Sequence, residues 1–156
     1  MRITIERAVG PTAEVHELIK ELNDVLGAAY KAHQRHGLSI EELFQPNLRF
    51  FLARLESLAA GCGGVAIFDD YAEVKRMYTR PVARRKGIAD ALLRRIEDAA
   101  RASGKSVLCL ETGIRQQEAV GLYERTGFRR RGPLGPYTAM PLDNIETSLF
   151  FEKQLT

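Results

Sequence analysis

The pattern of hydrophobic and polar residues predicts a strand and then a helix at the start of the chain. Residues 1–9 alternate between apolar and polar, with Ile3 and Ile5 on one face, as in a half-buried strand. From about 13 to 30, apolar residues recur at helical spacing, and Thr12 precedes them as an N-cap. The apolar stripe of this helix consists of Val15, Leu18, Ile19, Leu22, Val25, Leu26 and Ala29.

The next part of the chain predicts one short helix and three consecutive strands. Ser39 and Glu42 have the spacing of a capping box, so a short second helix is expected to begin at Ser39. Three apolar segments follow, and residues typical of turns separate them. The predicted strands are Phe50–Leu58, Gly63–Phe68 and Ala72–Tyr78, with turns at Gly61–Gly64 and at Asp69-Asp70.

Helices and strands alternate in the second half of the chain. Pro81 ends the third strand, a helix is expected from about Lys86 to Ser103, and Gly104 supplies its stop. The segments that follow are a strand at 107–111, a helix at 117–125, an extended segment from 128, a Pro/Gly-rich loop at 132–144 and a last strand at 148–153. This order predicts an α/β (α+β) fold, with a mixed sheet of about six or seven strands flanked by about four α-helices.

Length and composition narrow the class of protein. The 156 residues, 45% hydrophobic and 28% charged, fit a single globular domain over residues 1–156. No apolar run approaches the roughly 18 residues of a membrane-spanning helix, and the first residues lack the apolar segment of a secretory signal. Cys62 and Cys109 cannot form a disulfide framework, and no Cys/His spacing indicates zinc. We therefore expect a cytoplasmic protein without a metal and without a membrane partner.

Positive charge is concentrated in one segment. The formal net charge is +3, but residues 75–105 hold ten Lys or Arg against three acids. Such a local excess favours an anion site over the wrapping of nucleic acid, although a solvated helix face explains it equally well. Basic runs interleaved with aromatic residues are absent, so nucleic acid is not expected to be the main ligand.

Within this segment, a strand leads through a Pro-ended turn into a basic loop that opens a helix. The backbone N–H groups of the first helical turn have no intrahelical partners, and the helix dipole favours an anion there. Gly87 and Ala89 are small enough for a diphosphate to approach the backbone, and Arg84, Arg85 and Lys86 add positive charge. The segment is neither a Walker A sequence nor a G-x-G-x-x-G dinucleotide motif. Its chemistry is that of a pyrophosphate cradle.

A second segment carries candidate chemistry after the next strand. This buried strand ends at Glu111, and a polar turn leads into a helix that carries Tyr123. Taken together, the two segments resemble the GNAT superfamily of acetyl-CoA-dependent N-acetyltransferases. The residues that match its pyrophosphate signature, Arg/Gln-x-x-Gly-x-Gly/Ala, are Arg84, Gly87 and Ala89. The residues that match its second signature, Asn-x-x-Ala-x-x-Leu-Tyr-x-x-x-Gly-Phe, are Ala119, Leu122, Tyr123, Gly127 and Phe128, while Gln116 stands where Asn is usual.

The resemblance implies a GNAT-like fold and acetyl-CoA as co-substrate. In the family, the pantetheine arm of the coenzyme lies along the strand before the cradle and bonds to its backbone like an added strand. The family sheet splays apart at this point, commonly at a bulge, which frees the strand edge. The coenzyme-binding residues implied here are Met77, Tyr78, Thr79, Arg84, Arg85, Lys86, Gly87, Ile88, Ala89, Gln116, Ala119 and Tyr123.

The resemblance also implies direct attack of a primary amine on the thioester, with one group to take a proton and one to give a proton. Tyr123 resembles the general acid of the family, and its alternative is a packed tyrosine whose hydroxyl bonds to the backbone. Glu111 lies twelve residues before this tyrosine, as does the base of some family members. Glu73 on the neighbouring strand competes with it, and a water chain is the third alternative.

The acceptor is the least defined part of the prediction. Residues 20–50 and 132–144 are expected to set it, and they carry no motif that identifies a substrate. The leading hypothesis is a small-molecule or amino-acid-like amine. Two alternatives stay open: a protein, peptide or aminoacyl-tRNA acetyltransferase of the same fold, and a non-catalytic acyl-CoA-binding module. The choice between monomer and homodimer is open as well.

Overall fold

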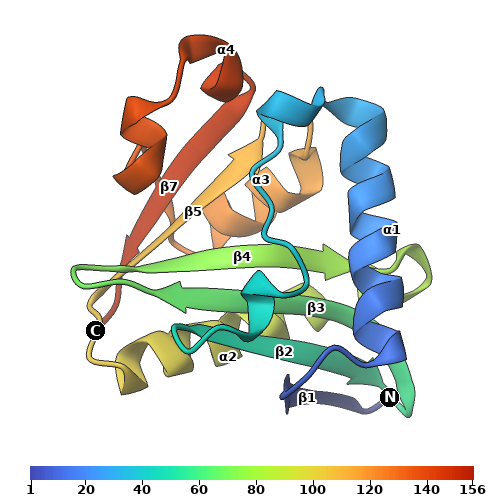
Figure 1. Ribbon diagram of the computed structural model, residues 1–156. Helices are drawn as coiled ribbons and strands as arrows, with labels where there is room; N and C mark the ends of the chain where they lie inside the picture. The colour runs from blue at the N-terminus through green and yellow to red at the C-terminus, as the bar shows by residue number, and fades with distance from the viewer.

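A seven-stranded mixed sheet runs through the computed structural model, which describes residues 1–156 (Figure 1). The strands lie in the order β1-β2-β3-β4-β5-β7-β6, and only β4 and β5 pair in parallel. Their bounds are Ile3–Ala8 (β1), Leu48–Leu55 (β2), Leu58–Ile67 (β3), Ala72–Thr79 (β4), Val107–Gly113 (β5), Arg129–Arg131 (β6) and Ser148–Gln154 (β7). The predicted mixed sheet is therefore confirmed.

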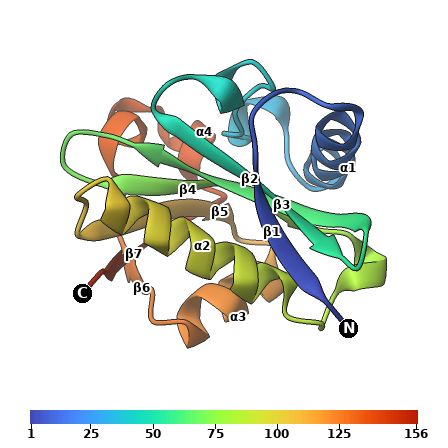
Figure 2. The same cartoon turned by 90° about the horizontal axis from the view of Figure 1, so that it is seen from below.

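Helices cover both faces of the sheet. Helix α1 lies on one face, and α2 and α3 lie on the other (Figure 2). The α-helices are Ala13–Ala29 (α1), Ile88–Ala102 (α2), Gln117–Arg125 (α3) and Leu142–Ile145 (α4). Single 3₁₀ turns occupy Ala32–Gln34, Glu42–Phe44, Pro81–Ala83 and Gly135–Ala139. No helix has the length and apolar character needed to cross a membrane.

The core has one layer on each face of the sheet because successive residues of a strand point in opposite directions. On β2, Phe51 and Ala53 join the larger apolar cluster beneath α2. Phe50 and Leu52 join the second cluster, which α1 covers. Both faces of the central strands are thus buried, and the helices are held at fixed positions against them.

Two predicted local structures are wrong. The glycines at Gly61–Gly64 lie inside β3, and the hairpin turn comes earlier, at Glu56-Ser57. A Cβ atom at position 61 would lie 2.5 Å from the Tyr78 carbonyl oxygen of β4 and 3.1 Å from the side chain of Ile88 on α2, so this glycine permits close packing. The helix expected at Ser39 is only a 3₁₀ turn, although Ser39 and Glu42 do form the reciprocal bonds of a capping box, at 2.9 and 3.2 Å.

The loop expected at residues 132–144 also contains more structure than its composition indicates. It holds the 3₁₀ turn Gly135–Ala139 and the short helix α4. Tyr137 and Leu134 anchor this segment in a small apolar cluster with Cys109 and Phe150 of the sheet. The segment therefore lies against β5 and β7 rather than extending into solvent.

The sheet opens between β4 and β5. These strands pair only at Ala72↔Leu108 and at Glu73↔Cys109, and beyond this point they diverge (Figure 1). A bulge in β4 lies on the diverging part, because the register against β3 shifts between Cys62 and Gly64. Arg76 lies at this bulge with a φ of +57°. The splay and bulge expected before the cradle are both present.

Candidate active site

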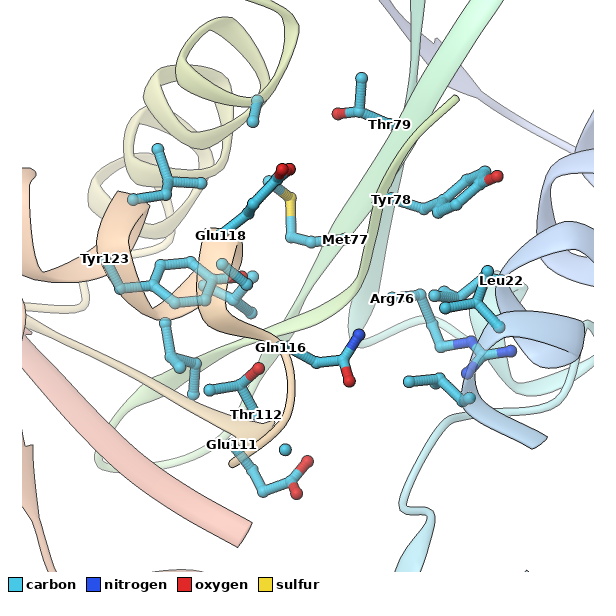
Figure 3. A pocket seen from close by; sticks show the side chains of 18 of the residues that line it. Leu22, Arg76, Met77, Tyr78, Thr79, Glu111, Thr112, Gln116, Glu118 and Tyr123 are labelled. Carbon is cyan, nitrogen blue, oxygen red and sulfur yellow. The ribbon is translucent and has the colours of Figure 1, made fainter. Parts of the chain in front are cut away.

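A cavity of about 700 Å³ lies where β4 and β5 diverge (Figure 3). At one end are the basic loop and the first turn of α2, and we call this the cradle end. At the other end are residues 34–37, Arg115 and Tyr137, and we call this the loop end. One side of the cavity is formed by Leu22, Val25 and Leu26 of α1 and by Tyr30, the residue directly after this helix. The cavity thus joins segments from the whole length of the chain.

The cradle end has the geometry of an anion site. The first hydrogen bond of α2 runs from the Ala91 N–H to the Gly87 carbonyl at 3.0 Å, so the N–H groups of the preceding turn have no intrahelical partner. Arg85 and Gly87 have φ values of +63° and +89°, which place alternate peptides of the loop in the left-handed region. Such a turn directs successive N–H groups toward one point, where they can bind an anion together.

Basic side chains surround this end unequally. Arg84 and Arg85 line the cavity, together with Gly87, Ile88 and Ala89. Lys86, which the motif placed with them, does not line it and is exposed, because the left-handed turns around it direct its side chain outward. On the far side of the first turn of α2, Arg125 of α3 forms an ion pair with Asp90 at 2.9 Å. The charge of Arg125 thus offsets the negative charge of Asp90, the acid in the first turn of α2.

The strand before the cradle presents its backbone to the cavity. Tyr78 and Thr79 pair with Cys62 and Gly61 of β3 on one side, and their other side faces the gap left by β5. The Tyr78 side chain points toward α1 (Figure 3), where its hydroxyl donates to Glu21 at 3.0 Å. Burial and this contact raise the pKa of Tyr78 to about 12. The Met77 side chain, by contrast, lies in the middle of the cavity (Figure 3).

Tyr123 reaches the cavity from α3 (Figure 3). Its ring is buried against Phe128 and Phe151, with centroid distances of 5.5 and 6.3 Å. Its hydroxyl forms no hydrogen bond within the protein; burial, and then the charge of Glu111, raise its pKa. The hydroxyl is therefore a protonated donor at neutral pH that has no partner in the fold.

The two candidate bases differ in how they are held. Ser148 donates to the Glu111 carboxylate at 2.6 Å, and burial raises the pKa of Glu111 despite this bond. Glu73 is only 2% exposed; its carboxylate accepts from the Tyr137 hydroxyl at 2.9 Å and pairs with Lys75 at 2.9 Å. Both glutamates line the same cavity, but only Glu111 lacks a cationic partner.

Gln116 connects the candidate site to α1. The Tyr30 hydroxyl donates to its side-chain oxygen at 2.8 Å and accepts from the Arg115 N–H at 2.8 Å. Gly113 makes room for this contact, because a Cβ atom there would collide with the Tyr30 hydroxyl. The amide of Gln116 extends into the cavity, and Ala119 lines it one turn further along α3 (Figure 3).

Several polar lining residues were not singled out from the sequence. Among them are Arg35, Lys75, Arg76, Arg115 and Tyr137. The alternation of β4 could have placed Lys75 beside Glu73, since residues two apart on a strand share a face. No sequence signal locates the bulge that displaces Arg76, or the fold of the loop that brings in Tyr137. No group of three or more potential metal ligands is present.

Comparisons with known proteins agree with this architecture. Residues 14–128 match the Acetyltransferase (GNAT) family. The chain is 45% identical over 155 residues to an IAA acetyltransferase of Azospirillum brasilense, covering 98% of each chain. The crystal structure of an acyl-CoA N-acyltransferase from Klebsiella pneumoniae superposes with a TM-score of 0.80 at 31% identity, covering 99% of this chain and 98% of that one.

A third similar structure was solved with coenzyme A bound. The PaiA N-acetyltransferase of Thermoplasma acidophilum, solved in complex with coenzyme A, has a TM-score of 0.73 at 18% identity and covers 99% of both chains. At that identity the likeness shows the fold alone, which is the fold expected from the two motifs. The family match and the relative at 45% identity show the family as well as the fold. The chain belongs to the GNAT family of N-acetyltransferases.

Proposed function

We propose that the protein transfers the acetyl group of acetyl-CoA to the primary amine of a small-molecule or amino-acid-like acceptor, by direct attack. The observation that carries this proposal is the convergence of three groups on one cavity. These are the free N–H groups at the start of α2, the unpartnered Tyr123 hydroxyl and the Glu111 carboxylate. They correspond to an anion site, a proton donor and a proton acceptor. We further propose that residues 1–156 form a single acetyltransferase domain.

The cradle end would hold the coenzyme. Its diphosphate fits the free N–H groups of Ile88 and Ala89, with Arg84 and Arg85 nearby. The amides of its pantetheine arm fit the backbone edge of β4 at residues 77–79 that β5 leaves unpaired, as an added strand would. The Arg84 side chain, which donates to the Thr79 carbonyl at 3.3 Å, would have to share or release that acceptor. When bound, acetyl-CoA supplies an acetyl group activated as a thioester.

Glu111 is the proposed general base. The acceptor amine arrives protonated at neutral pH and must lose a proton before it can attack. A carboxylate with a raised pKa holds a proton more readily than an ordinary glutamate. For Glu111, burial raises the pKa more than the Ser148 bond and the charges of His36 and Lys75 lower it. Glu73 is the weaker candidate, because its carboxylate is already bonded to Lys75 and Tyr137. A water that relays the proton to Glu111 would serve the same purpose.

Tyr123 is the proposed general acid. The thiolate that leaves the acetyl group is stabilised if it receives a proton as the carbon–sulfur bond breaks. The raised pKa of Tyr123 keeps its hydroxyl protonated at neutral pH, and the absence of a partner within the protein leaves that proton available. The position of the ring in the aromatic core fixes the direction of the hydroxyl.

A small acceptor is favoured by the closure of the loop end. His33 contacts Asp143 at 2.8 Å, and His36 bonds to the Asn144 carbonyl at 2.8 Å. These contacts join the loop after α1 to α4 and give this end a wall.

The test of the proposed function is an acceptor screen with acetyl-CoA in which free thiol release is measured. Amines, amino acids, peptides and IAA, which the name of the 45% identical relative mentions, form the panel. Acceptor-dependent thiol release with small amines is the expected result. Release with peptides alone would transfer the proposal to a macromolecular acceptor, and binding of acetyl-CoA without any release would indicate a non-catalytic module.

Replacing Tyr123 with Phe tests the general acid. We expect kcat to fall by about 10–1000-fold, because the proton donor is lost while the ring that packs in the core is kept. The affinity for acetyl-CoA, measured by calorimetry, should change little. Unchanged turnover would contradict the assignment and would leave water as the proton donor.

A further inference from the structure

The loop end of the cavity carries three arginines without an acidic partner. Arg35, Arg76 and Arg115 line it, and none has a carboxylate oxygen within 4.0 Å. The carboxylates nearby are Glu73, which is already in an ion pair, and Glu111. The loop end therefore has a surplus of positive charge, although the acceptor proposed for it is an amine.

This surplus constrains the chemistry of the acceptor. A simple ammonium ion is repelled from it, and charges interact more strongly in a partly buried cavity than in water. An amine that also carries an anion is attracted, because a guanidinium binds a carboxylate with two parallel hydrogen bonds. Taking the proposed function as its basis, we propose that Arg76 binds a carboxylate of the acceptor, which makes the substrate class amino acids and similar carboxylate-bearing amines.

Arg76 is distinguished from the other two arginines by its fixed position. Arg35 and Arg115 are exposed, and exposed arginines are common on protein surfaces. Arg76 lies at the bulge of β4 with a φ of +57°, a conformation that few residues other than glycine adopt. Backbone strain of this kind is retained mainly at functional sites. Figure 3 shows Arg76 on the α1 side of the cavity, opposite Tyr123.

The guanidinium is held in place but not satisfied. Its Nη2 donates to the Asn23 side chain, and Gly37 leaves room for Nη1, since a Cβ atom there would collide with it. No other N–H of the Arg76 side chain has an acceptor, and Nε is buried without one. Burial lowers the pKa of Arg76, because the fold removes water from the guanidinium and replaces it with a single hydrogen-bond acceptor, the Asn23 side chain. Buried donors are normally bonded, and an acceptor carboxylate supplies the missing oxygens.

The first test uses the unmodified protein. Acetyl transfer is measured for matched sets of amines: an amino acid, its carboxamide, and the amine that lacks the carboxyl group. We expect kcat/KM to be about 10–100-fold higher for the amino acid, in line with a charge-assisted bidentate contact. Equal or higher kcat/KM for the neutral compounds would overturn the proposal, as would preference for a phosphate-bearing amine over the matched carboxylate.

The second test is Arg76→Gln, which removes the charge and keeps an N–H donor for Asn23. The preference for the amino acid over its carboxamide should fall to within about threefold, while the KM for acetyl-CoA and turnover of the carboxamide are retained. Arg94→Gln, a matched loss of charge at an exposed position on α2 outside the cavity, should leave the preference intact. If Arg76 were only structural, Arg76→Gln would lower both activities together and leave their ratio unchanged.

The failure of this inference can be told apart from failure of the proposed function. Thiol release with any amine supports acetyl transfer, whichever amine is preferred. If no amine is acetylated, calorimetry with coenzyme A present compares the binding of amino acids and carboxamides. Selective binding of amino acids that Arg76→Gln abolishes would still support the carboxylate site, and equal binding by both proteins would overturn it. The comparison of substrates on the unmodified protein decides the question even if Arg76→Gln does not fold.

Discussion

At the scale of the residue, the environment of each side chain decides what two identical glutamates can do. Glu73 and Glu111 come from neighbouring strands and line one cavity. Lys75 and Tyr137 both contact the same oxygen of the Glu73 carboxylate, Oε2, which favours a structural role. Glu111 has one neutral donor, Ser148, and burial raises its pKa. Different surroundings for two neighbouring carboxylates are typical of sites in which one of them handles a proton.

Glu111→Gln tests this difference through the pH dependence of the rate. A base acts only when it is deprotonated, so the rate should rise with pH through the pKa of Glu111, above the ordinary value of 4.5. The variant should lose this acidic limb. Its melting temperature at neutral pH should equal or exceed that of the unmodified protein. A carboxyl group whose pKa is raised in the folded state destabilises that state once it ionises at higher pH. Gln cannot ionise, so the variant avoids this loss of stability. Survival of the limb in Glu111→Gln, with its loss in Glu73→Gln, would reassign the base.

At the scale of the element, the start of α2 combines a left-handed loop with a helix N-terminus. Gly87 is the N-cap at φ +89°, and only Ile3, at 3.7 Å, lies near the place of a Cβ atom. The glycine is therefore required by the backbone conformation rather than by crowding within the fold, and the proposed diphosphate position gives it a second reason. Gly104 ends the same helix at φ +78° with nothing within 4 Å. The two glycines place similar demands on the backbone, but only Gly87 lines the cavity.

This symmetry provides a matched pair of variants, Gly87→Val and Gly104→Val. Each should destabilise the fold by about 1–3 kcal/mol, since a β-branched residue is strained at positive φ. Only Gly87→Val should abolish acetyl-CoA binding, because its side chain would cover the free N–H groups. Thermal shift with and without acetyl-CoA measures both effects. Normal stabilisation of Gly87→Val by the coenzyme would mean that the diphosphate binds elsewhere.

At the scale of the whole molecule, the basic segment 75–105 does not form one continuous positive face. Arg80 pairs with Glu17 and Glu21 of α1, and Arg101 pairs with Glu97 and Asp98 on its own helix. The fold thus neutralises part of the charge that the sequence concentrates there. What is left beside the cavity is a small group of arginines, which suits one phosphorylated ligand better than a nucleic-acid strand.

The salt dependence of binding tests this distribution of charge. Affinity for acetyl-CoA should fall only about two- to tenfold between low and physiological ionic strength. Backbone N–H groups act at short range, and screening weakens mainly the exposed arginines. A nucleic-acid-binding protein with six or more phosphate contacts would lose about a thousandfold over a similar range. Titration of acetyl-CoA and of an oligonucleotide at two salt concentrations separates these cases. Tight oligonucleotide binding with a steep slope, and no thiol release, would exclude the acetyltransferase proposal.

The sequence alone was sufficient where the determining interactions are local. Helical periodicity predicted α1 and α3 almost to the residue, and the segment 84–89 was correctly predicted to be a loop that opens a helix. A free helix N-terminus and a positive φ depend on residues within one or two turns, so they can be read along the chain. Local signals failed at Gly61–Gly64, where the contacts that favour glycine come mainly from the neighbouring strands β2 and β4 and are not local in sequence.

Tertiary structure alone decided which side chains meet in the cavity. The bulge in β4 follows from register against β3 and displaces Arg76, and the folded segment after β6 places Tyr137 against Glu73. These outcomes depend on contacts between residues far apart in sequence, where a shift of one residue in a strand reverses the direction of a side chain. The family and the helix N-terminus proposed to hold the coenzyme could therefore be predicted from local pattern, whereas the side chains that meet at the loop end could not.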